Sequence, residues 1–284
     1  MEDKSKTAAL YVVATPLGNI ADITLRALDT LRTVAAVACE DTRHTRRLLD
    51  HYDIRVTTFP LHEHNEAGAA QKLIAMLAEG KSIALVSDAG TPGVSDPGAR
   101  AVAAVRAAGY PVIPLPGPNA AIAALSAAGL DEPNFLFVGF LSSKPGARRQ
   151  QIETLRATPA ALVFYEAPHR IVETIADLAE LLEPQRTLVV AREITKLFEQ
   201  IAAMPIAEAP AWLAADTNRQ RGEFVLLISA PPAAEGLAAD ALRTLGLLLA
   251  ELPLKQAVKL AAEISGAPKN ALYEQALAMK SEGL

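Results

Sequence analysis

The loop at residues 87–98 constrains the fold of this chain more than any other stretch. It follows a short apolar run at 83–86, typical of a buried strand, and precedes an alanine-rich run at 99–108 with high helix propensity. Asp96 and Pro97 predict the start of that helix, with Asp96 as the cap and Pro97 in the first helical position. In an open parallel sheet, the loop after a strand is where ligands bind. The loop is therefore either a ligand site or an ornate turn.

Short apolar runs alternate with helical patterns through the first half of the chain. The predicted strands are residues 10–13, 34–39, 56–59, 83–86 and 111–115. This alternation predicts βαβ units and a mostly parallel sheet, so we expect an α/β domain over residues 1–129. No strand is followed by the G-x-G-x-x-G spacing or by a P-loop, which argues against an ordinary dinucleotide fold and a P-loop phosphate site.

A second domain is expected over residues 130–230. Its predicted strands are residues 135–140, 161–165, 187–191 and 224–229, and residues 205–215 have a helical pattern. We therefore expect a second α/β or α+β domain.

The strand pattern stops beyond a Pro/Ala linker at 230–235. Residues 236–284 are expected to form a helical extension, with helices at 242–251, 255–264 and 269–278. The last two helices resemble a helix-turn-helix, with Leu272, Tyr273 and Leu277 facing inward. Such a pair is either a nucleic-acid contact, a hairpin packed on the rest of the chain or a dimer contact.

Composition narrows the function classes. The 284 residues are 51% hydrophobic and carry a net charge of −5, so any nucleic-acid role depends on local basic patches. Apolar runs are too short to span a bilayer, which predicts a soluble protein. The single cysteine, Cys39, excludes an intramolecular disulfide framework, makes a cysteine-rich zinc site implausible and fits a reducing cytoplasm. We therefore expect a cytoplasmic protein with no metal and no membrane contact.

Five loops that follow predicted strands are rich in glycine, proline or charge. They are residues 15–19, 40–44, 87–98, 116–119 and 165–170. Because such loops gather at one edge of a parallel sheet, we expect them to line one cleft between the two domains. The alternative is five unrelated turns.

These motifs, in this order, resemble the tetrapyrrole-methylase-type (class III) methyltransferases. They are Val-Val-Ala-Thr-Pro-Leu-Gly-Asn-Ile at 12–20, Glu-Asp-Thr-Arg at 40–43, the loop 87–98, Pro-Gly-Pro-Asn at 116–119, Tyr-Glu-Ala-Pro-His-Arg at 165–170 and Ala-Arg-Glu-Ile-Thr-Lys at 191–196. The tetrapyrrole enzymes of that family usually have a G-x-G-P-G-D-like first loop. Residues 15–19 depart from it, which favours the branch that modifies ribosomal RNA.

The resemblance implies an α/β fold of two domains with a cofactor cleft between them, plus the helical extension. It implies S-adenosyl-L-methionine as cofactor and transfer of its methyl group to the ribose 2′-hydroxyl of a cytidine in the decoding region of 16S ribosomal RNA. It further implies a homodimer that acts on the assembled small subunit. A methylase of the same fold that acts on a tetrapyrrole or a protein side chain, and a non-catalytic nucleic-acid-binding regulator, are the alternatives.

Residue roles follow from the same motifs. The residues that the resemblance assigns to the cofactor are Pro16, Gly18, Asp88, Ala89, Gly90, Thr91, Val94, Ser95, Asp96, Pro118, Asn119, Ala120, Tyr165, Glu166, Ala167, Pro168, Gly222, Glu223 and the adjacent Phe224. The expected catalytic residues are Glu40, Asp41, Arg43, His169 and Lys196, with His44, Glu166 and Glu193 as further candidates for a base. The expected RNA-binding residues are Arg43, Arg46, Lys144, Arg148, Arg149 and Arg170.

Several of these side chains also have structural interpretations. Glu40 or Asp41 is suited to cap the helix that follows, and Glu193 to pair with Arg192 or Lys196. Each basic cluster is either a solvated helix face or an RNA contact.

Overall fold

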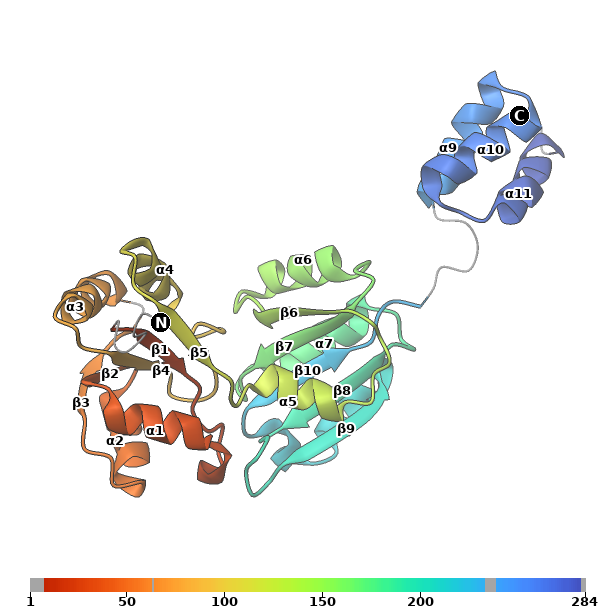
Figure 1. The fold of residues 1–284 in the computed structure, drawn as a ribbon. Coiled ribbons are helices and arrows are strands. Elements are labelled where there is room, and N and C mark those ends of the chain that lie inside the picture. The colour runs from red at the N-terminus through yellow and green to blue at the C-terminus, as the bar shows by residue number, and fades with distance from the viewer. Residues whose placement is uncertain (1–7, 63, 233–238, 282–284) are drawn as a thin grey trace. The chain divides into compact units, whose positions relative to one another are not determined.

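A computed structural model describes residues 8–62, 64–232 and 239–281 (Figure 1). The chain divides after Pro231 into two compact units. The first unit contains two five-stranded sheets, and the second contains three helices. The linker predicted at 230–235 lies partly outside the described residues.

The first sheet is entirely parallel, as the alternation of strands and helices predicts. Its strands are β1 (Leu10–Val13), β2 (Ala36–Cys39), β3 (Thr57–Pro60), β4 (Ile83–Val86) and β5 (Val112–Leu115). Their order is β3-β2-β4-β1-β5, and Val12 of β1 lies opposite Leu85 and Pro114. The loops after β1 and β4 are therefore neighbours at the carboxyl edge.

Helices cover both faces of this sheet, which is why its strands are apolar on both sides. The helices are η1 (Ile20–Asp22), α1 (Leu25–Thr33), α2 (Thr42–His51), α3 (Glu66–Ala78) and α4 (Ala99–Ala107). Helices α3 and α4 lie on one face of the sheet and α1 and α2 on the other (Figure 1).

The predicted start of α4 is wrong. The helix begins at Ala99, its N-cap position is Gly98, and Asp96 makes no cap. The buried carboxylate of Glu66, the first residue of α3, instead accepts hydrogen bonds from the backbone N–H groups of Gly98, Arg100 and Ala101 at 3.1, 2.9 and 3.2 Å. A side chain distant in sequence thus accepts the hydrogen bonds of the backbone N–H groups in the first turn of α4, so Asp96 is not needed as a cap.

The second sheet is mixed. Its strands are β6 (Phe135–Phe140), β7 (Ala161–Glu166), β8 (Thr187–Arg192), β9 (Gln200–Pro205) and β10 (Phe224–Ile228). In the order β6-β7-β10-β8-β9, only β6 and β7 pair in parallel. The edge strand β9 was not predicted, and the helix predicted over 205–215 is only η2 (Ile206–Glu208) and α8 (Ala209–Ala214).

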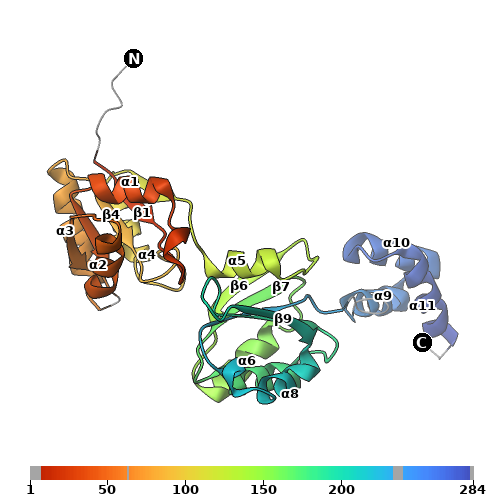
Figure 2. The ribbon, with the colours of Figure 1, turned by 90° about the horizontal axis from the view of Figure 1, so that it is seen from below.

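Helices also cover both faces of the second sheet. These are α5 (Ala120–Ala127), α6 (Pro145–Leu155), α7 (Ile171–Leu181) and α8, with η3 (Thr217–Gln220) after α8. Helix α5 packs on one face, against Val163, Val189 and Val225, and the other three pack on the opposite face (Figure 2).

The second unit is a three-helix cluster of α9 (Ala239–Glu251), α10 (Leu254–Ser265) and α11 (Lys269–Ser281). Leu272 is buried in its core as predicted, but Tyr273 and Leu277 are 38% and 48% exposed. Ala276 takes the inward position instead, because it lies one helical turn after Leu272. No helix among the described residues is long and apolar enough to cross a membrane.

Candidate functional site

The loops after β1 and β4 are joined by backbone hydrogen bonds. Thr15 and Gly90 exchange both of theirs at 2.9 Å, and the Thr15 hydroxyl donates to the carbonyl of Ser87 at 3.1 Å. The Thr91 hydroxyl donates to the carbonyl of Pro118 at 2.9 Å, which adds the loop after β5. Three of the five loops that were predicted to line one cleft therefore form one wall.

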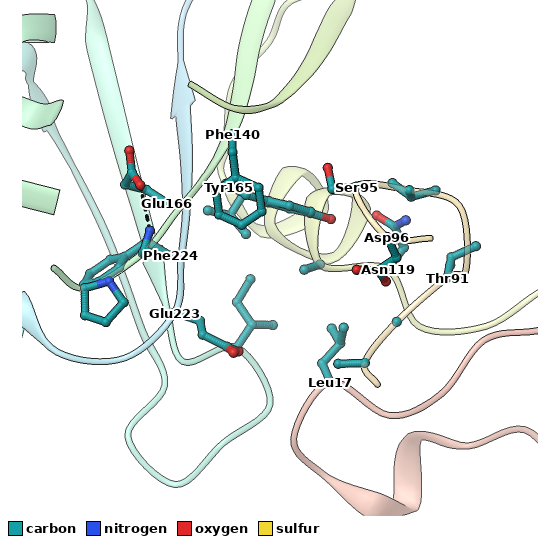
Figure 3. A pocket seen from close by; sticks show the side chains of 18 residues that line it. Leu17, Thr91, Ser95, Asp96, Asn119, Phe140, Tyr165, Glu166, Glu223 and Phe224 are labelled. Atoms are coloured by element: carbon teal, nitrogen blue, oxygen red, sulfur yellow. Dashed lines mark hydrogen bonds between the residues drawn. The ribbon is translucent and has the colours of Figure 1, made fainter. Parts of the chain in front are cut away.

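A cavity of about 310 Å³ lies between this wall and the loops of the second sheet (Figure 3). Its lining residues are Leu17, Ala89, Gly90, Thr91, Val94, Ser95, Asp96, Asn119, Ala120, Phe140, Tyr165, Glu166, Ala167, Pro168, Ile194, Glu223, Phe224 and Val225. We call it the first cavity. Its volume is at the lower end of the range for small-ligand sites, and its lining is largely apolar with a few polar groups.

Tyr165 provides an aromatic surface in the first cavity. Its ring lies edge to face with Phe137 and Phe140, at centroid distances of 4.9 and 5.7 Å. Its hydroxyl accepts a hydrogen bond from the Ala121 N–H at 3.2 Å, which ties α5 to β7. Burial raises the pKa of this phenol, so the group stays neutral. A fixed ring of this kind is suited to stack on a flat heterocycle.

Glu166 fixes the loop that follows β7. Its buried carboxylate accepts hydrogen bonds from Thr174 Oγ1 at 2.7 Å and from the Ala167 N–H at 2.8 Å, and lies 3.2 Å from Arg170 Nε. Arg170 also donates to the carbonyl of Leu141 at 2.6 Å. These two side chains hold the wall of the cavity, and the RNA-binding role of Arg170 stays a prediction.

A second cavity, of about 580 Å³, adjoins the first. Its lining residues are Thr15, Pro16, Leu17, Gly18, Ile20, His44, Thr45, Arg47, Leu48, Ser87, Asp88, Ala89, Lys196 and Glu223. The two cavities share three lining residues, namely Leu17, Ala89 and Glu223.

Carboxylates are concentrated around the two cavities. Burial, opposed by a hydrogen bond from Ser87 and aided by the charge of Asp88, raises the pKa of Asp96 to about 6. Burial, followed by the charges of Asp88 and Asp96, also raises the pKa of Glu40. A cation bound between these groups would be favoured electrostatically.

Asp41 caps the helix that follows it, which is the structural interpretation of this residue from the sequence. Its side chain caps α2 by accepting from the Arg43 N–H at 2.8 Å, and it pairs with the Arg43 guanidinium at 2.8 Å. These hydrogen bonds hold the pKa of Asp41 well below its usual range. The Asp41 N–H in turn donates to Asp88 Oδ1 at 3.0 Å, which orients that carboxylate at the second cavity.

Most residues predicted to bind the cofactor line the first cavity. Pro16, Gly18 and Asp88 line the second cavity instead, whereas Pro118 and Gly222 line neither. The predicted cofactor set did not include Leu17, Phe140, Ile194 and Val225. Leu17 and Ile194 lie inside predicted motifs and Val225 follows the predicted Phe224, so their sequence neighbours were the available signal. Phe140 ends a predicted strand and had no such signal.

The predicted catalytic residues are dispersed. Lys196 and the candidate base His44 line the second cavity, whereas Glu40, Asp41, Arg43 and His169 line neither cavity. Among the described residues, no group of His, Cys, Asp or Glu side chains is arranged to hold a metal ion.

One predicted RNA-binding cluster is largely internal. Arg148 is only 2% exposed and its Nε lies 2.6 Å from Asp177 Oδ2, and Arg149 pairs with Asp177 and Glu180 at 2.8 and 2.6 Å. These pairs join α6 to α7, and the RNA-binding role of Arg148 and Arg149 stays a prediction. Lys144 remains exposed.

Arg46 and Arg43 differ in availability. Arg46 donates to the Val56 carbonyl and to Thr58 Oγ1, both at 3.3 Å, whereas the Arg43 side chain is largely exposed. The RNA-binding role of either residue stays a prediction.

Known proteins resemble the chain over nearly all of its length. The family described as Tetrapyrrole (Corrin/Porphyrin) Methylases matches residues 9–210, and the RsmI C-terminal HTH domain matches residues 235–280. The chain is 51% identical to "Ribosomal RNA small subunit methyltransferase I" of Pseudomonas aeruginosa, over 94% of this chain and 96% of that protein. It is 52% identical to the protein of the same name from Escherichia coli O157:H7, over 94% of both chains.

Solved structures share the fold at lower identity. Uroporphyrin-III-C-methyltransferase from Thermus thermophilus superposes with a TM-score of 0.56 at 22% identity, over 78% of this chain and 94% of that chain. A structure of the Thermus thermophilus enzyme complexed with S-adenyl homocysteine has a TM-score of 0.55 at 18% identity, over 78% and 97%. Diphthine synthase has a TM-score of 0.58 at 18% identity, over 78% and 90%.

Proposed function

The chain belongs to the tetrapyrrole methylase family, and from this premise we propose that it is an S-adenosyl-L-methionine-dependent methyltransferase of small-subunit ribosomal RNA. Its target is the ribose 2′-hydroxyl of cytidine 1402 in 16S ribosomal RNA. The observation that carries the proposal is the full-length similarity at about half identity, because the fold alone is shared with enzymes named for other substrates.

The first cavity is suited to the methyl donor. Tyr165 and Phe140 offer ring surfaces for the adenine, and the loop of residues 89–96 offers backbone and hydroxyl groups for the ribose and the amino-acid part. Asp96 places a carboxylate where a cationic sulfonium benefits from it.

The second cavity is suited to the target nucleotide. It adjoins the first, is larger, and includes the basic side chain of Arg47. The sulfonium of the donor supplies an activated methyl group, so the main task of the protein is to align donor and acceptor for in-line displacement. The residues shared by the two cavities define where that alignment takes place.

The same proposal covers the partners and the setting. The substrate is 16S ribosomal RNA in the small subunit, the protein is a homodimer, and it works in the bacterial cytoplasm. The second unit, α9–α11, contributes to recognition of the ribosomal substrate, a role consistent with its helix-turn-helix family match.

The test is to incubate the protein with labelled S-adenosyl-L-methionine and small subunits from cells that lack it, and to map the labelled nucleotide. We expect label on the ribose of cytidine 1402. Label on a precorrin or on a ribosomal protein, with none on the RNA, would replace this function by another activity of the same fold. Calorimetry that detects no binding of the donor at millimolar concentration would favour a non-catalytic regulator.

A further inference from the structure

The segment from Glu193 to Lys196, after β8, has an unusual backbone. Glu193 and Thr195 adopt φ values of +52° and +67°, in the left-handed region that side chains with a Cβ rarely occupy. The conformation is held by hydrogen bonds: the Glu193 N–H donates to the Glu223 carbonyl at 2.9 Å, and the Thr195 N–H to Glu199 Oε2 at 2.6 Å. Backbone strain of this kind concentrates at functional sites, so the side chains that it places are of interest.

This backbone brings Glu193, Lys196 and Glu223 into one ionic network, which we call the Glu-Lys-Glu triad. Lys196 Nζ lies 2.9 Å from Glu193 Oε1 and 2.9 Å from Glu223 Oε2. The Glu223 N–H also donates to Glu193 Oε1 at 2.9 Å. Within the part of the chain that the structure describes, no hydrogen bond reaches Glu223 Oε1.

Two glycines make room for the triad. A Cβ at Gly222, whose φ is +93°, would lie 2.6 Å from Glu193 Cδ. A Cβ at Gly18, in the loop after β1, would overlap Lys196 Cγ. The triad thus touches the loops of both sheets, and the Asn19 N–H donates to Thr195 Oγ1 at 3.2 Å beside it.

Among the residues that the structure describes, Glu223 has a position that no other ionisable residue shares. Of the three residues that line both cavities, Leu17 and Ala89 are apolar and only Glu223 can accept a proton. Figure 3 shows Glu223 and Leu17 reaching toward the cavity from the two sides of the site. A methyl group that passes from the first cavity to the second must cross where these walls meet.

Lys196 itself is unsuited to accept the proton. Burial would lower the pKa of its amine, but the hydrogen bonds to Glu223 and Glu193 outweigh burial and raise it. The group therefore remains an ammonium, with one of its three N–H donors left after the two carboxylates are satisfied.

The charge of the triad also indicates what it faces. Two carboxylates and one ammonium sum to −1, which suits a cationic sulfonium and a neutral hydroxyl and disfavours a phosphate. The triad is therefore matched to the reacting groups rather than to the RNA backbone.

We infer that Glu223 is the base that takes up the proton of the acceptor ribose hydroxyl, and that Lys196 is the residue that positions it; the inference rests on the proposed function. As the acceptor oxygen forms its bond to the methyl carbon, the carbon–sulfur bond breaks and its electron pair stays on sulfur. The hydroxyl proton passes to Glu223 Oε1. The products are the 2′-O-methyl ribose, a neutral thioether and a protonated Glu223, which returns its proton to water.

The principal experiment compares Glu223→Gln with the wild type in single-turnover methylation of small subunits. Glutamine keeps the shape and the acceptor for Lys196 but cannot take up a proton. We expect donor affinity by calorimetry within about threefold of wild type and a methylation rate lower by about 10²- to 10⁴-fold, the usual contribution of a general base. Glu208→Gln, on an exposed residue that lines neither cavity, is the matched control and should keep wild-type rates.

Lys196→Met tests the positioning role and remains informative if the first variant is unstable. We expect a lower maximal rate and an unchanged salt dependence of subunit binding. Lys196→Arg should restore part of the rate.

The inference is overturned by a Glu223→Gln variant that methylates within tenfold of wild type, or by one whose rate falls only as much as its donor affinity. A weaker salt dependence in Lys196→Met would show a phosphate contact and overturn the positioning role. If the wild type itself does not methylate small-subunit RNA, the proposed function fails, and the inference fails with it. An active wild type with an active Glu223→Gln variant removes the inference alone.

Discussion

The carboxylate of Glu66 fixes the end of the loop of residues 87–98, where α4 begins. One oxygen of this side chain accepts from the N–H groups of Gly98, Arg100 and Ala101, and two of these three hydrogen bonds are buried. Replacement by alanine removes all three at once. A buried donor left without a partner costs about 1–3 kcal/mol, so two such donors, partly relieved by water, predict a loss of about 2–4 kcal/mol from the free energy of unfolding of the first unit.

Glu66→Gln removes the charge of the side chain but keeps its shape. The amide oxygen can still accept these hydrogen bonds, but neutral hydrogen bonds are roughly half as strong as charge-assisted ones, so we expect a loss of about 1 kcal/mol. Because α4 begins where the loop of residues 87–98 ends, both variants should weaken donor binding, alanine more than glutamine. The measurements are urea unfolding, amide hydrogen exchange at residues 98–101 and calorimetry with S-adenosyl-L-methionine.

The control is Glu79→Ala, at the other end of α3. Glu79 forms an exposed pair with Lys81 at 2.6 Å, and such pairs contribute at most about 1 kcal/mol. If Glu66→Ala unfolds within 0.5 kcal/mol of wild type (roughly the error of such measurements) and keeps its protection at residues 98–101, Glu66 does not anchor the loop.

The remaining predictions concern charge and aromatic contacts. Because the raised pKa of Asp96 is about 6 and a cationic sulfonium favours the ionised carboxylate, affinity for S-adenosyl-L-methionine should rise as the pH increases through 6. S-adenosylhomocysteine, which lacks the sulfonium charge, should show a weaker dependence, and equal dependence would refute the assignment. Arg148→Met leaves Asp177 without its buried partner and should lower the free energy of unfolding by about 3–5 kcal/mol. Arg149→Ala should lower it by at most about 1 kcal/mol. Equal losses in urea unfolding would contradict the burial of the Arg148–Asp177 pair. Tyr165→Phe should keep donor affinity within about threefold and Tyr165→Ala should lose more than tenfold by calorimetry, because the ring carries the contact; a reversed order would exclude stacking.

The architecture of the first sheet could be predicted because its signal is local. Each βα unit shows an apolar run, a turn and a helical pattern in order, and such units dictate parallel strands. The second sheet carries the same apolar runs, but a run does not encode the direction of its partner. The edge strand β9 was missed for a related reason: only one side of it pairs, and its residues Gln200–Pro205 alternate between half-buried and exposed positions without a strong apolar run.

The differences between the sequence patterns and the structure of the site arise from partners far away in the sequence. Asp96 followed by Pro97 satisfies every local rule for a helix start, yet Glu66, some thirty positions earlier, supplies the cap. Arg148 and Arg149 form a basic patch in the sequence, but the acidic residues of α7, such as Asp177, neutralise it in the fold. Local sequence patterns therefore identified the loops that line the cavities. Hydrogen bonds and ion pairs to residues far away in the sequence determine which side chains of this region remain unpaired.

The contrast between local patterns and long-range contacts also explains why the sequence did not predict Glu223 as a base. Its sequence neighbours, Gly222 and Phe224, lie at the start of a predicted strand. No local sequence pattern connects that strand to the segment that contains Lys196. The connection arises because β10 and β8 pair in antiparallel register, with Phe224 opposite Arg192, so that the segment after β8 and the residues before β10 meet at one end of the sheet. The antiparallel pairing that the sequence could not predict is thus what assembles the triad, and a parallel second sheet would have placed Glu223 and Lys196 at opposite ends of their strands.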